Sequence, residues 1–148
     1  LQDGVASATL LARAGLNRLG NADLATATFE PEYMLPAVAQ GAIGLECRVD
    51  DAETVAKLRA IGCRDTERTV RAERAMLAGL DGSCRTPIAG LCLLEGDALW
   101  LRGLVALGDG TQVWTAQARG SDPETVGRDV AAQLREKAGH LPWQPPLL

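Results

Sequence analysis

Three strand-like segments, separated by tight-turn dipeptides, constrain the fold of this chain more than any other feature. They cover residues 86–94, 98–107 and 112–119, with Gly-Asp at 96–97 and Asp-Gly at 109–110 between them. Glycine and aspartate tolerate the positive φ angles of tight hairpins, so consecutive segments are expected to pair in antiparallel fashion. The pattern predicts a small three-stranded antiparallel sheet.

Two helical segments flank this sheet. Ser121 or Asp122, followed by Pro123 at the first helical position, predicts a helix to about residue 138 that covers one face of the sheet. Before the sheet, a helix opening at residues 65–66 has its glutamates and arginines, Glu73 among them, predicted to face water. Its apolar stripe consists of Val70, Ala75, Met76, Leu77 and Leu80. The combination predicts an α+β fold.

The first 62 residues carry weaker signals. A short buried helix is expected from Leu10 to a stop at Gly20, and residues 41–49 have the apolar character of a buried strand. Asp50 or Asp51 is expected to cap a further helix that ends at Gly62. The apolar residues sharing one face of that helix are Val55, Leu58 and Ile61.

Composition narrows the classes of function. The 148 residues are 47% hydrophobic and 23% charged, as in globular proteins, and no apolar run reaches the roughly 20 residues that span a bilayer. The N-terminus lacks a signal-peptide pattern, so a cytoplasmic location is expected. The net charge of −4, with scattered arginines, predicts neither a nucleic-acid nor a membrane partner.

The four cysteines contain no C-x-x-C pair, and the single histidine, His140, lies in a Pro-rich tail that is expected to be irregular. These features predict reduced thiols and no metal site. Cys47 and Cys92 lie in apolar runs and are expected in the core, whereas Cys63 is expected to be exposed or half-buried.

Cys84 lies in a glycine-flanked loop, DGSCRTPI, directly after a predicted helix. The neighbouring Arg85 favours the thiolate, while the helix C-terminus disfavours an anion. Local chemistry alone therefore leaves open whether Cys84 is reactive or a structural loop residue. No histidine is placed to act as its general base, which disfavours a cysteine hydrolase.

Four segments occur in the order and approximate spacing seen in one enzyme family. They are AGLNRLG (14–20), LPAVAQGAIGLECR (35–48), AERAM (72–76) and GSCRTPI (82–88). On these segments the chain resembles the C-terminal half of the porphobilinogen deaminases, also called hydroxymethylbilane synthases. The resemblance covers essentially the whole chain.

The resemblance implies a transferase that polymerises porphobilinogen into the linear tetrapyrrole hydroxymethylbilane on a cysteine-linked dipyrromethane primer. The position matching the anchor cysteine is Cys84, as a covalent thioether. Arg18 matches a family arginine expected to contact the carboxylates of the cofactor or the growing polypyrrole chain. Gln40 and Gly41 match a cofactor-binding GQGA turn, which reads AQGA here.

The family layout divides the chain into the end of the second domain (1–24), a returning strand and helix of the first domain (25–62), and the C-terminal cofactor-anchoring domain (63–148). The family's catalytic aspartate belongs to N-terminal segments, so this chain is expected to hold no catalytic residue and to be an inactive fragment without that half. Strands and helices without their domain partners expose apolar edges. The fragment is therefore expected to dimerise through its N-terminal part or to repack that part on the third domain.

Two alternatives come from other classes of protein. One is a small non-catalytic α+β binding or regulatory domain in which Cys84 is structural. The other is a cysteine-dependent redox or thiol-transfer protein, which the absence of a C-x-x-C pair disfavours.

Overall fold

The computed structural model describes residues 1, 3–83, 85–139 and 141, and it divides into two compact units, Leu1–Met34 and Leu35–Leu148. Cys84, His140 and the end of the Pro-rich tail lie outside the described residues. Each unit is described here by itself.

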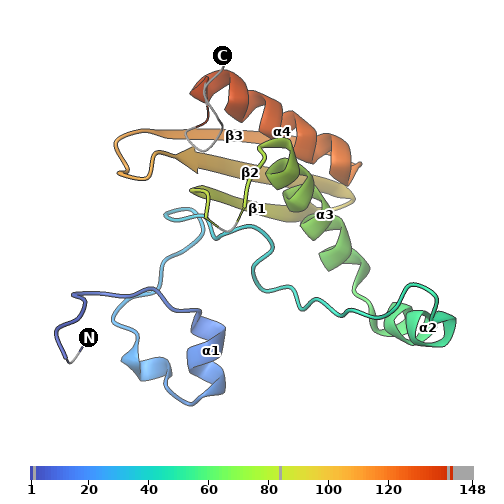
Figure 1. Ribbon diagram of the computed structural model, residues 1–148, viewed down its shortest axis with the longest axis horizontal. Coiled ribbons are helices and arrows are strands. Elements are labelled where there is room, and N and C mark those ends of the chain that lie inside the picture. The colour runs from blue at the N-terminus through green and yellow to red at the C-terminus, as the bar shows by residue number, and fades with distance from the viewer. Residues whose placement is uncertain (2, 84, 140, 142–148) are drawn as a thin grey trace. The chain divides into compact units, whose positions relative to one another are not determined.

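The second unit contains the predicted sheet. Strands β1 (Ile88–Glu95), β2 (Ala98–Ala106) and β3 (Val113–Gly120) pair in the antiparallel order β1-β2-β3 (Figure 1). Their bounds differ from the predicted segments by at most two residues. The three-stranded meander and the α+β fold are therefore confirmed.

Two long helices, α3 (Arg64–Gly79) and α4 (Pro123–Ala138), pack on one face of the sheet and against each other (Figure 1). Asp122 caps α4 by accepting the Thr125 N–H at 2.8 Å, as the sequence predicts. Strand residues of alternating position point at the helices, because side chains of a strand alternate between its two faces. One face of the sheet therefore forms a single core with α3 and α4.

Met76 lies at the centre of this core, over two glycines that face each other across β1 and β2, Gly90 and Gly103. A Cβ at either glycine would overlap the Met76 side chain. The buried apolar residues are Ala72, Met76, Leu80, Ile88, Cys92, Leu99, Leu101, Val105, Ala116, Val126, Val130, Ala131, Leu134 and Leu141. The prediction of a core position for Cys92 is confirmed.

Glu73 departs from the predicted pattern. The expectation that the glutamates of this helix face water is wrong for Glu73, whose residue is only 5% exposed. It follows Ala72 and precedes Met76 by three positions, on the buried face of α3. Its two carboxylate oxygens accept backbone N–H groups, and buried polar groups require such partners.

Residues 41–49 do not form the predicted strand, and Ile43 and Val49 are 89% and 98% exposed. No described strand lies beside this segment to complete a hydrogen-bond ladder, and a strand requires such a partner. Cys47 is only half-buried, so its predicted core position is wrong. Helix α2 (Ala52–Ile61) follows with the predicted Asp51 cap, but it contains no buried residue.

The first unit has two short helices, α1 (Arg13–Arg18) and η1 (Ala22–Leu24), neither with a buried residue. The predicted stop at Gly20 is confirmed, but the prediction of a buried helix is wrong. A six-residue helix gains stability mainly from packing an apolar face, and the leucines around α1 are exposed. None of the described helices is long and apolar enough to cross a membrane.

Candidate functional site

The loop from α3 to β1, residues 80–87, carries position 84, which lies outside the described residues. The flanking residues Ser83 and Arg85 are both exposed. Thr86 joins the two sides of this position: its hydroxyl donates to the Ser83 carbonyl at 2.6 Å and accepts the Ser83 N–H at 2.9 Å. Hydrogen bonds between Ser83 and Thr86 therefore join the two sides of position 84.

The start of this loop is a tight reversal. The Gly82 N–H donates to the Leu77 carbonyl at 2.9 Å, which satisfies one of the free carbonyls at the end of α3. Asp81 has a φ of 51°, in the left-handed region where L residues are uncommon. Because these contacts fix the backbone at residues 81 and 82, they set the direction in which the chain leaves α3.

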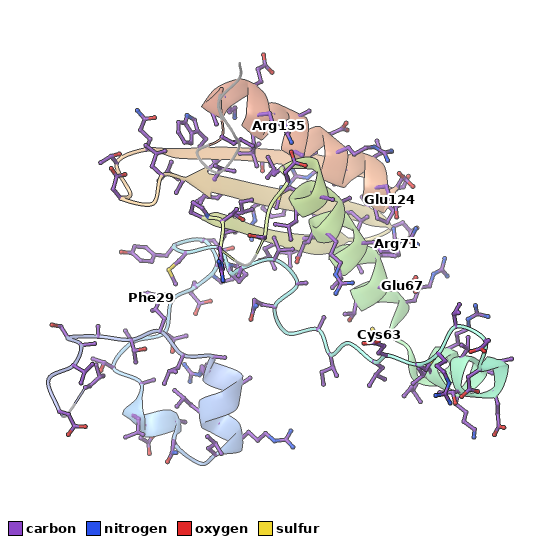
Figure 2. All side chains as sticks on the ribbon, in the orientation of Figure 1. Phe29, Cys63, Glu67, Arg71, Glu124 and Arg135 are labelled. Carbon is purple, nitrogen blue, oxygen red and sulfur yellow. The ribbon has the colours of Figure 1, made fainter. Side chains whose placement is uncertain are left out.

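Arg135, from α4, binds the same reversal (Figure 2). Its Nε donates to the carbonyl of Gly79 at 2.6 Å, and a terminal nitrogen lies 2.7 Å from the Asp81 carboxylate. At the other end of the helix pair, Arg71 of α3 lies 2.6 Å from Glu124 of α4. An ion pair therefore joins α3 and α4 at one end of their contact, and Arg135 joins α4 to the end of α3 and to the loop at the other.

The turn with the predicted cofactor-binding residues Gln40 and Gly41 belongs to the same unit as the loop. Ala39 and Gly41 have φ angles of 61° and 82°, so the backbone turns sharply around Gln40. Upstream of the turn, the Pro36 carbonyl accepts the Gly90 N–H of β1 at 3.0 Å. The segment that leads into the Gln40 turn is therefore held against the edge of the sheet.

Glu73 connects this turn to the sheet. One carboxylate oxygen accepts the Ala39 N–H at 2.6 Å, and the other accepts the Cys92 N–H of β1 at 2.8 Å. Burial raises the pKa of Glu73, while the two N–H donors act in the opposite direction. Sequence reasoning missed this residue, although its spacing of three from both Val70 and Met76 was a signal that it shares their buried face.

Two described cysteines differ sharply in their chemistry. Burial, together with the charge of Glu73, raises the pKa of the Cys92 thiol to about 12, so that thiol is inert at neutral pH. Cys63 lies exposed just before α3 (Figure 2). A hydrogen bond from the Thr66 side chain lowers the pKa of its thiol. Cys63 is therefore the natural control for any modification assigned to Cys84.

The remaining predicted site residue, Arg18, is the last residue of α1 and is exposed. It belongs to the Leu1–Met34 unit, whereas Gln40, Gly41 and the loop around position 84 belong to the Leu35–Leu148 unit. Within the described part of the chain, no group of histidine, cysteine, aspartate or glutamate side chains could hold a metal ion.

Two family models match the chain in sequence order. Residues 1–56 match the model described as "Porphobilinogen deaminase, dipyromethane cofactor binding domain", and residues 67–136 match "Porphobilinogen deaminase, C-terminal domain". The second match includes most of α3, the loop around position 84, the sheet and nearly all of α4. The first includes Arg18 and the Gln40 turn.

Curated relatives agree with these models. A protein of Paracoccus denitrificans named porphobilinogen deaminase is 54% identical over 140 residues, which cover 93% of this chain and 45% of that protein. Proteins of the same name from Nitrobacter hamburgensis and Nitrobacter winogradskyi are each 51% identical over 138 residues, covering 92% of this chain and 44% of each relative. The chain therefore spans less than half the length of these relatives.

Proposed function

The chain belongs to the porphobilinogen deaminase family, and we propose that it forms the C-terminal half of a hydroxymethylbilane synthase. This enzyme would polymerise porphobilinogen into hydroxymethylbilane on a dipyrromethane primer attached to Cys84. The observation that carries the proposal is the match of two models of one family, in order, to residues 1–56 and 67–136. The cofactor, when bound, would supply the pyrrole end from which the chain grows.

The residues around position 84 fit a covalently attached group. Ser83 and Arg85, on either side of position 84, are both exposed. The Ser83–Thr86 hydrogen bonds use the Ser83 backbone, and the Ser83 hydroxyl accepts the Arg85 N–H at 3.2 Å. Cys84 would act as a permanent tether, since a thioether is stable to turnover.

The carboxylates of the cofactor and the growing chain need cationic partners. Arg18 is exposed at the end of α1 and can donate from two nitrogens to one carboxylate. The Gln40–Gly41 turn offers an amide side chain, and its glycine would let a ligand come close to the backbone. We assign binding to these residues and no proton transfer, which belongs to groups of the N-terminal half.

The apolar side chains left exposed in this chain support a requirement for that half. Val5, Leu11 and Leu19 of the first unit, and Ile43 and Val49 of the second, are each more than 60% exposed. Such surfaces are usually covered by a partner. The cover would be the N-terminal half or, in its absence, a second copy of this chain.

We place the complete protein in the cytoplasm.

A turnover assay of the full-length protein tests this function. Purified protein incubated with porphobilinogen should release ammonia and form hydroxymethylbilane, and Cys84→Ser should abolish both. Cys63→Ser, which changes an exposed cysteine outside the loop, should keep wild-type turnover. Full activity in Cys84→Ser would refute the role of Cys84, and an inactive wild-type protein would favour a non-catalytic binding domain.

A further inference from the structure

Arg135 contacts both the end of α3 and the first reversed residue of the following loop. Its Nε hydrogen bond to the Gly79 carbonyl satisfies a helix-end acceptor, and its ion pair with Asp81 holds a residue three positions before Cys84. A planar guanidinium can make both contacts at once because its donors point in a fixed fork.

Asp81 is held in an unfavourable backbone conformation. Its φ of 51° is in the left-handed region, which a residue other than glycine adopts only when the surrounding structure holds it there. The Asp81 N–H donates to the Ala78 carbonyl at 3.1 Å, so the backbone turns back over the end of α3. The ion pair with Arg135 fixes the side-chain end of the same residue.

Arg135 lies on a part of α4 that is firmly packed in the core. The preceding residue, Leu134, is fully buried in the core, which fixes the rotation of α4. At this end the two helices are in close contact, since a Cβ at Gly79 would lie 2.7 Å from the Ala131 Cβ. The guanidinium is therefore presented to the loop by packed secondary structure.

We propose that Arg135 is a positioning residue for the loop that carries Cys84. The proposal rests on the proposed function, in which Cys84 tethers the cofactor, so that the position of the loop sets where the growing chain begins. Misplacing a reacting group by about 1 Å can reduce a rate by up to about 100-fold. Arg135 would thus influence turnover without touching substrate.

The test compares Arg135→Gln with Arg71→Gln in the full-length protein. Both changes remove one ion pair made by an arginine. Arg135 of α4 binds Asp81 of the loop, whereas Arg71 of α3 binds Glu124 near the start of α4 and not the loop. Hydrogen exchange of residues 80–88 should accelerate at least about tenfold in Arg135→Gln, which loses the charge-assisted hydrogen bond to Gly79 and the ion pair with Asp81. Arg71→Gln should leave exchange in this segment unchanged.

Kinetics supply the second readout. With rates expressed per adduct-bearing molecule, Arg135→Gln should lower kcat about tenfold with little change in KM, because the substrate is not contacted. Arg135→Lys keeps the charge but not the fork, and should recover part of both losses. If Arg135→Gln does not fold, Arg135→Lys decides alone: an intermediate loss supports the proposal, and wild-type exchange and kcat overturn it.

The positioning role would be overturned if Arg135→Gln and Arg71→Gln showed the same hydrogen exchange in the loop and the same kcat. A wild-type protein without adduct or turnover would instead refute the proposed function. The hydrogen-exchange comparison would still measure the effect of Arg135 on the loop, so the two failures can be told apart.

Discussion

The carboxylate of Glu73 accepts the backbone N–H of Ala39 at 2.6 Å, joining two residues that are 34 positions apart in the chain. Its second oxygen accepts the Cys92 N–H of β1. A single buried side chain thereby attaches the Gln40 turn to the sheet and to the helix that precedes the Cys84 loop. Two of the three segments predicted to bind cofactor, the Gln40 turn and the Cys84 loop, are thereby joined within one packed unit.

Replacing Glu73 with glutamine should destabilise this unit by about 1–3 kcal/mol, the cost of leaving a buried donor unsatisfied. The amide has one acceptor oxygen, and its NH2 group would face the second backbone N–H. The free energy of unfolding from urea titration measures the effect. Glu67→Gln is the matched control on the exposed side of α3 and should change stability little. Equal stabilities of the two variants would contradict the role of Glu73.

The raised pKa of Glu73 predicts a pH dependence. In the pH range between the ordinary glutamate pKa and the higher pKa of Glu73, the folded state binds more protons at this site than the unfolded state. Its contribution to the free energy of unfolding therefore falls as pH rises through that range. The difference in the free energy of unfolding between wild type and Glu73→Gln, measured across pH, separates this slope from the titration of other groups. A difference that grows with rising pH would contradict the sign.

Close contact between α3 and α4 predicts that Gly127→Ala is destabilising. A Cβ there would overlap the Ala72 carbonyl and lie 2.8 Å from the Met76 nitrogen, so backbone has to move. We expect a loss of about 1–3 kcal/mol, as for overpacked cores, in spite of the higher helix propensity of alanine.

Thermal and chemical unfolding of Gly127→Ala provide the measurement. Gly15→Ala is its matched control, because Gly15 also lies in a helix but a Cβ there would meet nothing within 4 Å. Stabilisation by Gly127→Ala, equal to that of the control, would show that the helices are not in contact as described.

The sheet and the helices around it were predictable because their signals are local. The turn residues at Gly96 and Gly110, both with positive φ, and the Asp122 cap act within a few positions of the chain. These signals do not depend on which segment lies across the core. They fixed the strands at β1, β2 and β3 to within two residues.

The failures concern residues whose environment depends on distant segments. The apolar run at 41–49 reads as a strand, but it has no described neighbour with which to pair. Glu73 reads as a surface charge, because its partners at Ala39 and Cys92 are remote in sequence. The Arg135 contact with Gly79 joins residues 56 positions apart and leaves no local pattern at all.

The identity of the candidate site came from a different source. Local chemistry left Cys84 undecided between a tether and a structural residue, and only the four family segments favoured the tether. The structure adds the fixed reversal at Asp81 and the closed turn between Ser83 and Thr86. These features describe how the loop that carries Cys84 is held. Whether Cys84 bears the cofactor is tested by chemical analysis of the protein.

Intact mass spectrometry of the full-length protein purified from cells answers that question most directly. We predict an adduct of dipyrromethane size, located by trypsin digestion to the peptide of residues 75–85, which contains Cys84 as its only cysteine. The adduct should be absent in Cys84→Ser and retained in Cys63→Ser. An unmodified mass in a preparation that converts porphobilinogen, or an adduct that persists in Cys84→Ser, would contradict the assignment of Cys84 as the cofactor tether.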